Sequence, residues 1–349
     1  MVSMNRLLFQ QLRRFLGLAS VLVLSGCGGS NAPSTTVLKG GGATLPYPVY
    51  AKWFSDYQKE RPQVQIDYQA SGSGAGVEGL LEGELDFAAS DTPLSDEQLT
   101  RFKVKPLHFP TLVGAIVPAY NLGKGYSGLK FSGDVLAQIF SGKIKNWSDS
   151  ALVRLNPDAN LPSKPIVVIH RSDPSGTTAV FTHYLSQVSD TWKKQVGEGT
   201  TVHWPASQAA QGSEGVADLV SKTEGSIGYL ELNYAKKHNL AFGSVRNRAG
   251  EFQSANFETV GGAIDSIQDL PKDFRILMTN APGEKAYPIA TMTYLLVPSQ
   301  IPDVQKREAI KRLLHWIYTT GQKVALDFDY DLLTPAMLNP VSDQAADIH

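Results

Sequence analysis

The stretch Arg171-Ser172-Asp173-Pro174-Ser175-Gly176-Thr177 lies between a predicted strand and a predicted helix. Residues 166–169 form a continuous β-branched run, which is typical of a buried strand. After the stretch, apolar residues recur at helical spacing at Phe181, Tyr184, Leu185, Val188 and Trp192. Residues 175–177 therefore begin a helix, where free backbone N–H groups can bind an anion. Because Arg171 adds a permanent charge with several donors, the stretch predicts an anion site.

Two earlier junctions repeat this combination of glycine and hydroxyl at a predicted helix start. Thr44-Leu45-Pro46 follows a glycine-rich segment at 40–43, and Ser-Gly-Ser-Gly-Ala-Gly at 71–76 follows the alternating strand 64–68. Ser and Thr cap many helices that bind nothing, so the repetition is what favours a site. In open α/β sheets such loops lie where ligands bind. Neither a P-loop nor the full dinucleotide motif is present, which favours a small anion over a nucleotide.

Asp91 ends a further short predicted strand and precedes Thr92-Pro93. One interpretation is a turn aspartate that bonds its own backbone, which is common at such positions. The other places a carboxylate in the anion site, which makes sense only if the ligand carries a proton, because an ionised carboxylate accepts but cannot donate. Hydrogen phosphate has such a proton, whereas sulfate at neutral pH has none. The residues alone leave both interpretations open.

The first 26 residues have the pattern of a lipoprotein signal peptide. Three arginines precede an apolar run at 15–24 that is too short to span a membrane, and a small-residue cleavage sequence follows. Cys27, the single cysteine of the chain, comes next, where a bacterial lipoprotein carries its diacylglyceryl group. We expect Cys27 to be lipidated and residues 27–36, rich in Gly, Ser, Asn and Pro, to be a flexible tether.

Charge and histidine spacing argue against several classes of function. Removal of three arginines with the signal peptide leaves 29 basic against 33 acidic residues, a formal charge of −4, which argues against a nucleic-acid partner. The seven histidines show no metal-ligand spacing, so we expect neither a metal site nor a cofactor. A phosphatase-like hydrolase with Asp91 or Ser73 as nucleophile would need a metal cluster or a positioned base, and the sequence shows neither. Binding of another tetrahedral oxyanion, such as sulfate or arsenate, is the second alternative.

The chain resembles the substrate-binding proteins of bacterial phosphate-specific ABC transporters from about residue 37 to its last predicted helix. The matching segments, in order, are Gly-Ala-Thr-Leu-Pro-Tyr-Pro-Val-Tyr-Ala-Lys-Trp (42–53), Gly-Ser-Gly-Ala-Gly-Val (72–77), Asp-Phe-Ala-Ala-Ser-Asp-Thr-Pro-Leu-Ser-Asp (86–96), Gly-Lys-Ile-Lys-Asn-Trp (142–147), Arg-Ser-Asp-Pro-Ser-Gly-Thr-Thr (171–178) and Gly-Ser-Ile-Gly-Tyr (225–229). Alternating strands and helices independently predict an α/β protein with a parallel or mixed sheet. The resemblance implies the two-lobed periplasmic-binding-protein fold of type II, with two hinge crossovers.

The resemblance also implies a set of phosphate ligands. They fall on Thr44, Leu45, Ser73, Asp91, Arg171, Ser175, Gly176 and Thr177, and Asp173 matches the acidic residue that pairs with the arginine. Leu45 stands where an aromatic residue is usual, but the contact expected there is through its backbone N–H.

The family's topology further implies a first lobe of residues 37–118 and 289–349, a second lobe of 119–288, and phosphate between them. Crossings near 118–121 and 287–290 would form the hinge. We expect a monomeric binding protein, not an enzyme, that passes phosphate to ABC permease subunits for import. Its location would be the periplasmic side of the cell envelope, on a membrane through its lipid.

Overall fold

The computed structural model describes residues 35–205, 207–267 and 269–349. The predicted signal peptide, Cys27 and the tether up to residue 34 lie outside the described residues. The predicted end of the tether at residue 36 is wrong, because Thr36 already belongs to β1 and pairs with Val64 of β2. The strands are β1 (Thr36–Gly42), β2 (Val64–Gln69), β3 (Phe87–Ser90), β4 (Pro106–Asn121), β5 (Lys130–Phe131), β6 (Val167–Arg171), β7 (Gln208–Ala210), β8 (Ser226–Glu231), β9 (Ala241–Phe242), β10 (Ser244–Arg246), β11 (Phe252–Gln253) and β12 (Ala290–Pro298).

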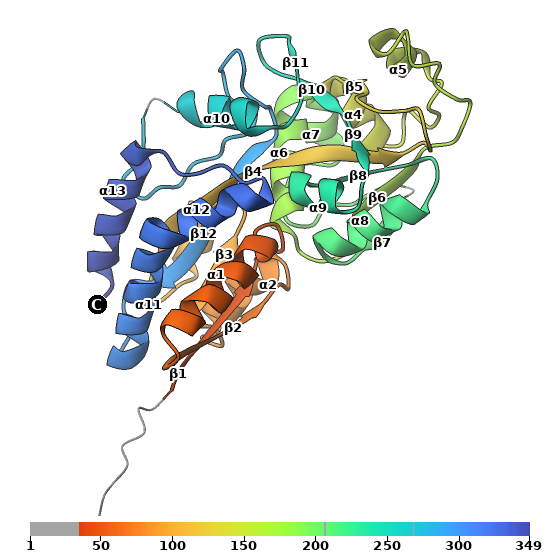
Figure 1. The fold of residues 1–349 in the computed structure, drawn as a ribbon. Helices are drawn as coiled ribbons and strands as arrows, with labels where there is room; N and C mark the ends of the chain where they lie inside the picture. The colour runs from red at the N-terminus through yellow and green to blue at the C-terminus, as the bar shows by residue number, and fades with distance from the viewer. Residues whose placement is uncertain (1–34, 206, 268) are drawn as a thin grey trace, which may run out of the picture. The chain divides into compact units, whose positions relative to one another are not determined.

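Helices separate most of these strands (Figure 1). The α-helices are α1 (Tyr47–Glu60), α2 (Ser73–Leu81), α3 (Asp96–Thr100), α4 (Gly133–Phe140), α5 (Ser150–Leu155), α6 (Gly176–Val188), α7 (Asp190–Gln195), α8 (Gly212–Lys222), α9 (Leu232–Lys237), α10 (Phe257–Asp265), α11 (Val304–Trp316), α12 (Gln322–Ala325) and α13 (Pro335–Gln344). A π-helical turn, η1 (Ile317–Gly321), and two 3₁₀ turns, η2 (Leu326–Phe328) and η3 (Ala345–Asp347), complete the C-terminal part.

Nine of the described strands form one mixed sheet in the order β2-β1-β3-β12-β4-β8-β6-β7, with β9 also paired to β4. β1 runs parallel to β2 and β3, and β6 runs parallel to β7 and β8. β12 and β4 are antiparallel to each other and to their outer neighbours. The predicted α/β class with a mixed sheet is therefore confirmed. Each parallel group sends the carboxyl ends of its strands into helix-starting loops, which positions the candidate site.

The long strand β4 connects the two parallel groups. Its first part pairs with β12 and its last six residues pair with β8. Pro118 lies inside this strand, which continues to Asn121. Proline lacks an N–H, but the Pro118 carbonyl still accepts a hydrogen bond from the Gly243 N–H at 3.0 Å. The strand therefore continues although Pro118 has no backbone N–H to donate.

The helix predicted after Thr177 is also shorter than its apolar spacing suggested. α6 ends at Val188, and Trp192 belongs to the separate helix α7. The reason is Ser189, whose backbone is extended and whose hydroxyl accepts the Trp192 N–H, so that it caps a new helix. Both helices keep their apolar residues on the buried side, which is why the periodicity runs through the break.

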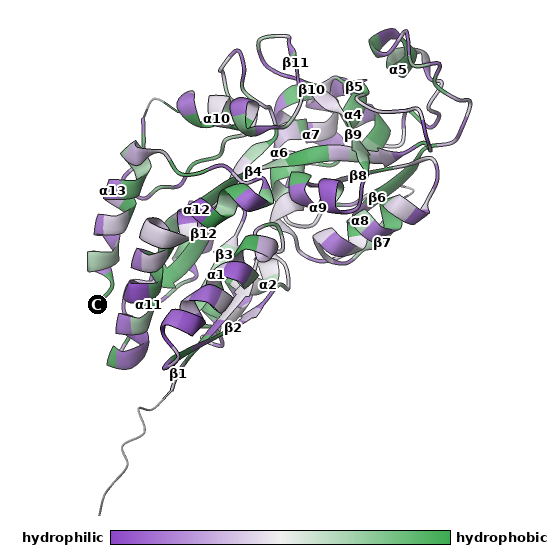
Figure 2. Cartoon of the chain, in the orientation of Figure 1, coloured by the Kyte–Doolittle hydropathy of each residue, from purple (hydrophilic) through white to green (hydrophobic). Residues whose placement is uncertain are grey.

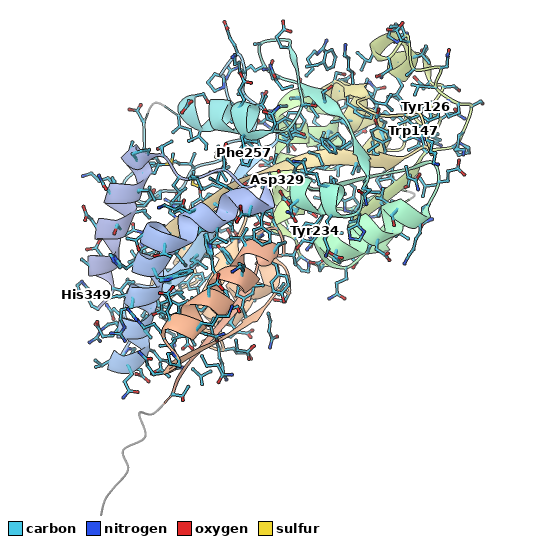
Figure 3. The ribbon with its side chains drawn as sticks, viewed as in Figure 1. Tyr126, Trp147, Tyr234, Phe257, Asp329 and His349 are labelled. Atoms are coloured by element: carbon cyan, nitrogen blue, oxygen red, sulfur yellow. The ribbon has the colours of Figure 1, made fainter. Side chains whose placement is uncertain are left out.

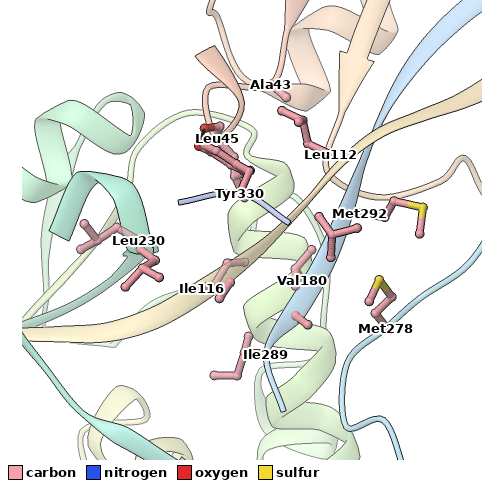
Figure 4. Packing of buried hydrophobic residues seen from close by; sticks show 14 of the residues in the cluster. Ala43, Leu45, Leu112, Ile116, Val180, Leu230, Met278, Ile289, Met292 and Tyr330 are labelled. Carbon is pink, nitrogen blue, oxygen red and sulfur yellow. Dashed lines mark hydrogen bonds between the residues drawn. The ribbon is translucent and has the colours of Figure 1, made fainter. Parts of the chain in front are cut away.

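Apolar residues fill the space between the sheet and its helices. Hydrophobic residues follow β12 and much of β4 (Figure 2), and a close view shows Ile116, Leu112 and Met292 packed at the centre (Figure 4). Trp53 and Trp192 are both buried in this core. Within the described residues, no helix is both long and apolar enough to cross a membrane.

Candidate anion-binding site

Four strand-to-helix junctions bring the predicted site residues together. Thr44 and Leu45 follow β1, Ser73 is the first residue of α2 after β2, and Asp91 follows β3. Arg171 is the last residue of β6, and Ser175 caps α6 through its hydroxyl, which accepts the Thr178 N–H at 3.2 Å. All of these side chains are buried. The sequence pattern of glycine and hydroxyl at helix starts thus converges on one place.

Hydrogen bonds join the β1–β3 loops to the start of α6. The Ser73 Oγ accepts the Asp91 N–H at 3.2 Å, and the Thr177 Oγ1 donates to the Asp91 Oδ2 at 3.4 Å. The Gly74 N–H donates to the Pro174 carbonyl at 3.1 Å. Gly176 permits this approach, because a Cβ there would lie 2.2 Å from the Ser73 Oγ and 2.8 Å from the Asp91 Cβ.

Arg171 supplies the positive charge of the site and is held by Asp173. Its Nε donates to the Asp173 Oδ1 at 2.8 Å, and its Nη2 donates to the Oδ2 of the same carboxylate. This two-point pairing fixes the guanidinium plane and leaves Nη1 free to face Thr177 at 3.5 Å. Burial would raise the pKa of Asp173, but the Arg171 bonds and charge outweigh it and lower the pKa below its usual value.

Asp91 is an acceptor in surroundings that disfavour its charge. Burial raises its pKa to about 6, although the bond from Thr293 and the Arg171 charge act in the opposite direction. The Thr293 Oγ1 donates to the Asp91 Oδ1 at 3.0 Å, and the Thr291 Oγ1 donates to the Asp91 carbonyl at 2.7 Å. The two threonines lie on β12, so the central strands of the sheet set the orientation of this carboxylate.

Several backbone N–H groups at the site have no acceptor within the part of the chain that the structure describes. In α6 the Thr178 and Ala179 N–H groups bond to Ser175, which leaves those of Gly176 and Thr177. The N–H groups of Leu45 and Ser73 are likewise without a partner in the same ranges. Together with Arg171 these donors can bind an anion, and Asp91 is placed to accept a proton-bearing oxygen.

Sequence reasoning missed two polar residues at the site. Ser213 begins α8, and its Oγ contacts the Thr44 Oγ1 at 3.0 Å and the Arg171 Nη1 at 3.4 Å. Gly212-Ser213 follows the short strand β7, so the glycine-and-hydroxyl pattern used for the other junctions would have found it. Thr293 lies inside β12, where nothing in the local pattern distinguishes it from a packing residue. In the described ranges no cluster of three metal-ligating side chains occurs.

The fold is a mixed α/β fold with a buried, polar candidate site at its strand ends, and the family model described as a PBP superfamily domain matches residues 29–320. The phosphate-binding protein PstS of Pasteurella multocida (strain Pm70) is 40% identical over 309 residues, which cover 88% of this chain and 89% of the relative. The chain therefore belongs to the PstS family of phosphate-binding proteins. The resemblance read from its motifs is confirmed.

Solved structures agree on the fold. The phosphate-binding protein of Stenotrophomonas maltophilia superposes with a TM-score of 0.65 at 20% identity, covering 89% of this chain and 94% of that one. A high affinity periplasmic phosphate-binding protein, solved with bound phosphate at pH 8.5, has a TM-score of 0.70 at 20% identity, with 88% and 94% covered. The predicted periplasmic-binding-protein fold is therefore confirmed.

Proposed function

We propose that the protein binds inorganic phosphate at this site and delivers it to the permease of an ABC transporter for import. The observation that carries the proposal is the buried convergence of Arg171, Asp91 and the start of α6, in a chain that belongs to the PstS family. One cation, free N–H groups and hydroxyls match the oxygens and negative charge of the anion. The Asp91 carboxylate can accept a hydrogen bond from a protonated oxygen of the anion.

Arg171 is the principal charge partner in this proposal. Its guanidinium is held by Asp173, so little side-chain freedom is lost when the anion binds. The Gly212 N–H donates to the Asp173 Oδ1 at 3.0 Å and so restrains Asp173 in turn. Thr44, Leu45 and Ser73 contribute from the β1–β3 end of the sheet, and Ser175, Gly176 and Thr177 contribute from α6.

Asp91 is the selectivity residue in this proposal. Its carboxylate already accepts one hydroxyl on each oxygen and has further acceptor capacity, which a phosphate O–H fits. Sulfate at neutral pH carries no proton, so its oxygens would face an acceptor of like charge. The same reasoning admits arsenate, which keeps its proton, as a competing ligand.

We also propose that phosphate binds between two lobes, residues 37–118 with 289–349 and residues 119–288. Contacts such as that of Gly74 with Pro174 then form between the lobes and belong to the closed state. The hinge lies where the chain crosses near 118–121 and 287–290. Phosphate favours closure because it bonds to both lobes at once.

Binding without reaction is part of the proposal. The alternative hydrolase would use Ser73 or Asp91 as a nucleophile. In the described part of the chain, the Ser73 Oγ is occupied by the Asp91 N–H instead of a general base. Asp91 in turn is held by Thr293 and Thr177. Such bonds orient the two groups to hold an anion, not to attack one.

The lipid attachment predicted at Cys27 completes the proposal for the location. A diacylglyceryl group would hold a monomer at a membrane on the periplasmic side, near its permease. Cys27 lies outside the described residues, and its support is the signal-peptide pattern of the sequence.

Calorimetric titration of the mature protein with phosphate tests the proposal. Arg171→Ala should weaken phosphate binding at least tenfold, because loss of a buried charge partner costs about 2–5 kcal/mol. Arg171→Lys should bind phosphate almost as weakly as Arg171→Ala, since lysine keeps the charge but loses the planar donors. Arg154→Ala, at an exposed arginine on α5, is the matched control and should bind as wild type does. Unchanged affinity in a folded Arg171→Ala protein would refute the assignment.

A further inference from the structure

Two buried tyrosine hydroxyls bond to consecutive carbonyls of the loop after β1. The Tyr234 hydroxyl, on α9, donates to the Thr44 carbonyl at 2.7 Å. The Tyr330 hydroxyl, which follows η2, donates to the Leu45 carbonyl. Figure 4 shows Tyr330 directly against Leu45, and Figure 3 places Tyr234 where α9 approaches α1. Neither tyrosine is among the residues that the site itself requires.

The bond from Tyr234 sets the orientation of the Leu45 N–H. The Thr44 carbonyl and the Leu45 N–H belong to the same peptide unit, which is planar and trans, so the two groups point in opposite directions. A hydroxyl that holds the carbonyl from behind therefore directs the N–H away from α9. Donation to the carbonyl also polarises the peptide and makes its N–H a stronger donor.

A buried carboxyl stands behind Tyr330. Glu231, at the end of β8, is fully buried, and its Oε2 accepts the Asn233 N–H at 2.8 Å. Its Oε1 has no hydrogen-bond partner in the described part of the chain. The Tyr330 hydroxyl faces this carboxyl, and burial, assisted by the Asp329 charge, raises the pKa of Glu231 well above its usual value.

No cation in the described ranges is placed to balance an ionised Glu231. The nearby Lys236 Nζ is paired with the Asp329 Oδ1 at 2.6 Å, and Lys237 is paired with Glu214 on α8. The facing groups are thus two tyrosines, a backbone N–H and a second acid. A neutral carboxyl suits them, because its O–H can donate to the Tyr330 oxygen while the Tyr330 proton goes to Leu45.

We propose that Tyr234 and Tyr330 are positioning residues for phosphate binding, which hold the peptide groups before and after Leu45 so that the Leu45 N–H faces the anion, and that Glu231 in its acid form supports Tyr330. The inference rests on the proposed function. Tyr234 and Glu231 belong to 119–288, whereas Thr44, Leu45 and Tyr330 belong to the other predicted lobe. The Tyr234 bond to Thr44 and the contact of Glu231 with Tyr330 therefore form on closure and slow phosphate release.

Tyr234→Phe tests the inference in the mature protein. The variant should bind phosphate about tenfold more weakly, through faster release, because it loses one buried hydrogen bond. The phosphate-induced shift of the Leu45 amide resonance should shrink as well, which a general loss of stability would not cause. Tyr318→Phe is the matched control, since the buried Tyr318 hydroxyl donates to the Pro110 carbonyl at 2.9 Å and should leave both readouts unchanged.

Glu231 is tested by two substitutions. Glu231→Gln should bind within about twofold of wild type, because an amide donates and accepts as the neutral acid does, whereas Glu231→Leu should lose about tenfold or more. Wild-type affinity and an intact Leu45 shift in Tyr234→Phe would overturn the positioning role. A tenfold loss in Glu231→Gln would overturn the acid form. If wild-type protein itself does not bind phosphate, the proposed function fails instead.

Discussion

At the scale of single residues, Asp91 shows how surroundings decide chemistry. A turn aspartate would be exposed and fully ionised, whereas this one is buried, bonded to β12 and shifted to a pKa of about 6. Above that value the carboxylate would accept a hydrogen bond from a phosphate O–H and disfavour sulfate. Below it the acid can itself donate to either anion, so discrimination weakens as the pH falls through 6.

Asp91→Asn should therefore reduce the preference for phosphate over sulfate. A site built around a ligand's proton rejects analogues without it by up to about 10⁴-fold, and an amide that can donate removes most of that penalty. Calorimetry with both anions at pH 7 and pH 5 measures the ratio. In wild type the phosphate-to-sulfate affinity ratio should be lower at pH 5 than at pH 7. In Asp91→Asn the ratio should be the same at both pH values. Equal ratios for the two proteins at pH 7 would show that Asp91 does not sense the ligand's proton.

At the scale of elements, the start of α6 packs so closely against the loops that follow β1, β2 and β3 that Gly176 has no space for a side chain. A Cβ on Gly176 would overlap the Ser73 Oγ and the Asp91 Cβ. Both residues are buried, and the Asp91 N–H donates a hydrogen bond to the Ser73 Oγ. The backbone of Gly176 is helical, so alanine is tolerated by α6 itself. The substitution should thus affect the contact between elements and not the helix.

Gly176→Ala should lower phosphate affinity at least about a hundredfold, since relief of such overlap costs a few kcal/mol. Small-angle scattering should show compaction on phosphate addition in wild type and none in the variant. Gly215→Ala, in α8, is the control, because its Cβ would lie 3.7 Å from the nearest atom. A Gly176→Ala protein that binds and compacts as wild type does would contradict the proposed closure.

At the scale of the whole molecule, the predicted signal peptide and the predicted lipidation of Cys27 would determine the location of the protein. The tether that the sequence predicts could reach no further than residue 35, because β1 already begins at Thr36. The proposed lipidation would anchor the protein more firmly than a single acyl chain, because a diacylglyceryl group carries two chains.

Cys27→Ser should abolish palmitate labelling and leave the protein unprocessed or released from the membrane fraction. Phosphate binding by the mature domain should be unaffected, because Cys27 lies outside the residues that form the site. Metabolic labelling followed by fractionation measures both effects. Labelling of Cys27→Ser equal to that of wild type would refute the lipoprotein hypothesis without touching the phosphate site.

The sequence by itself determined the α/β class, three of the strand-to-helix junctions and the resemblance that pointed to the site residues. These features are local: a β-branched run, a glycine beside a hydroxyl, and helical spacing are each read within about ten residues. Such patterns report which residue begins a helix. They do not report which helix starts meet.

Only the tertiary structure decided what surrounds each site residue. Thr293 lies 202 residues from Asp91, and Tyr234 lies 190 residues from Thr44, so no spacing rule joins them. Burial, which raises the pKa of Asp91 and of Glu231, likewise depends on every element packed around a group. Local propensity selects strands and helices, but the dielectric environment and partners of a buried side chain come from distant chain segments that only folding brings together.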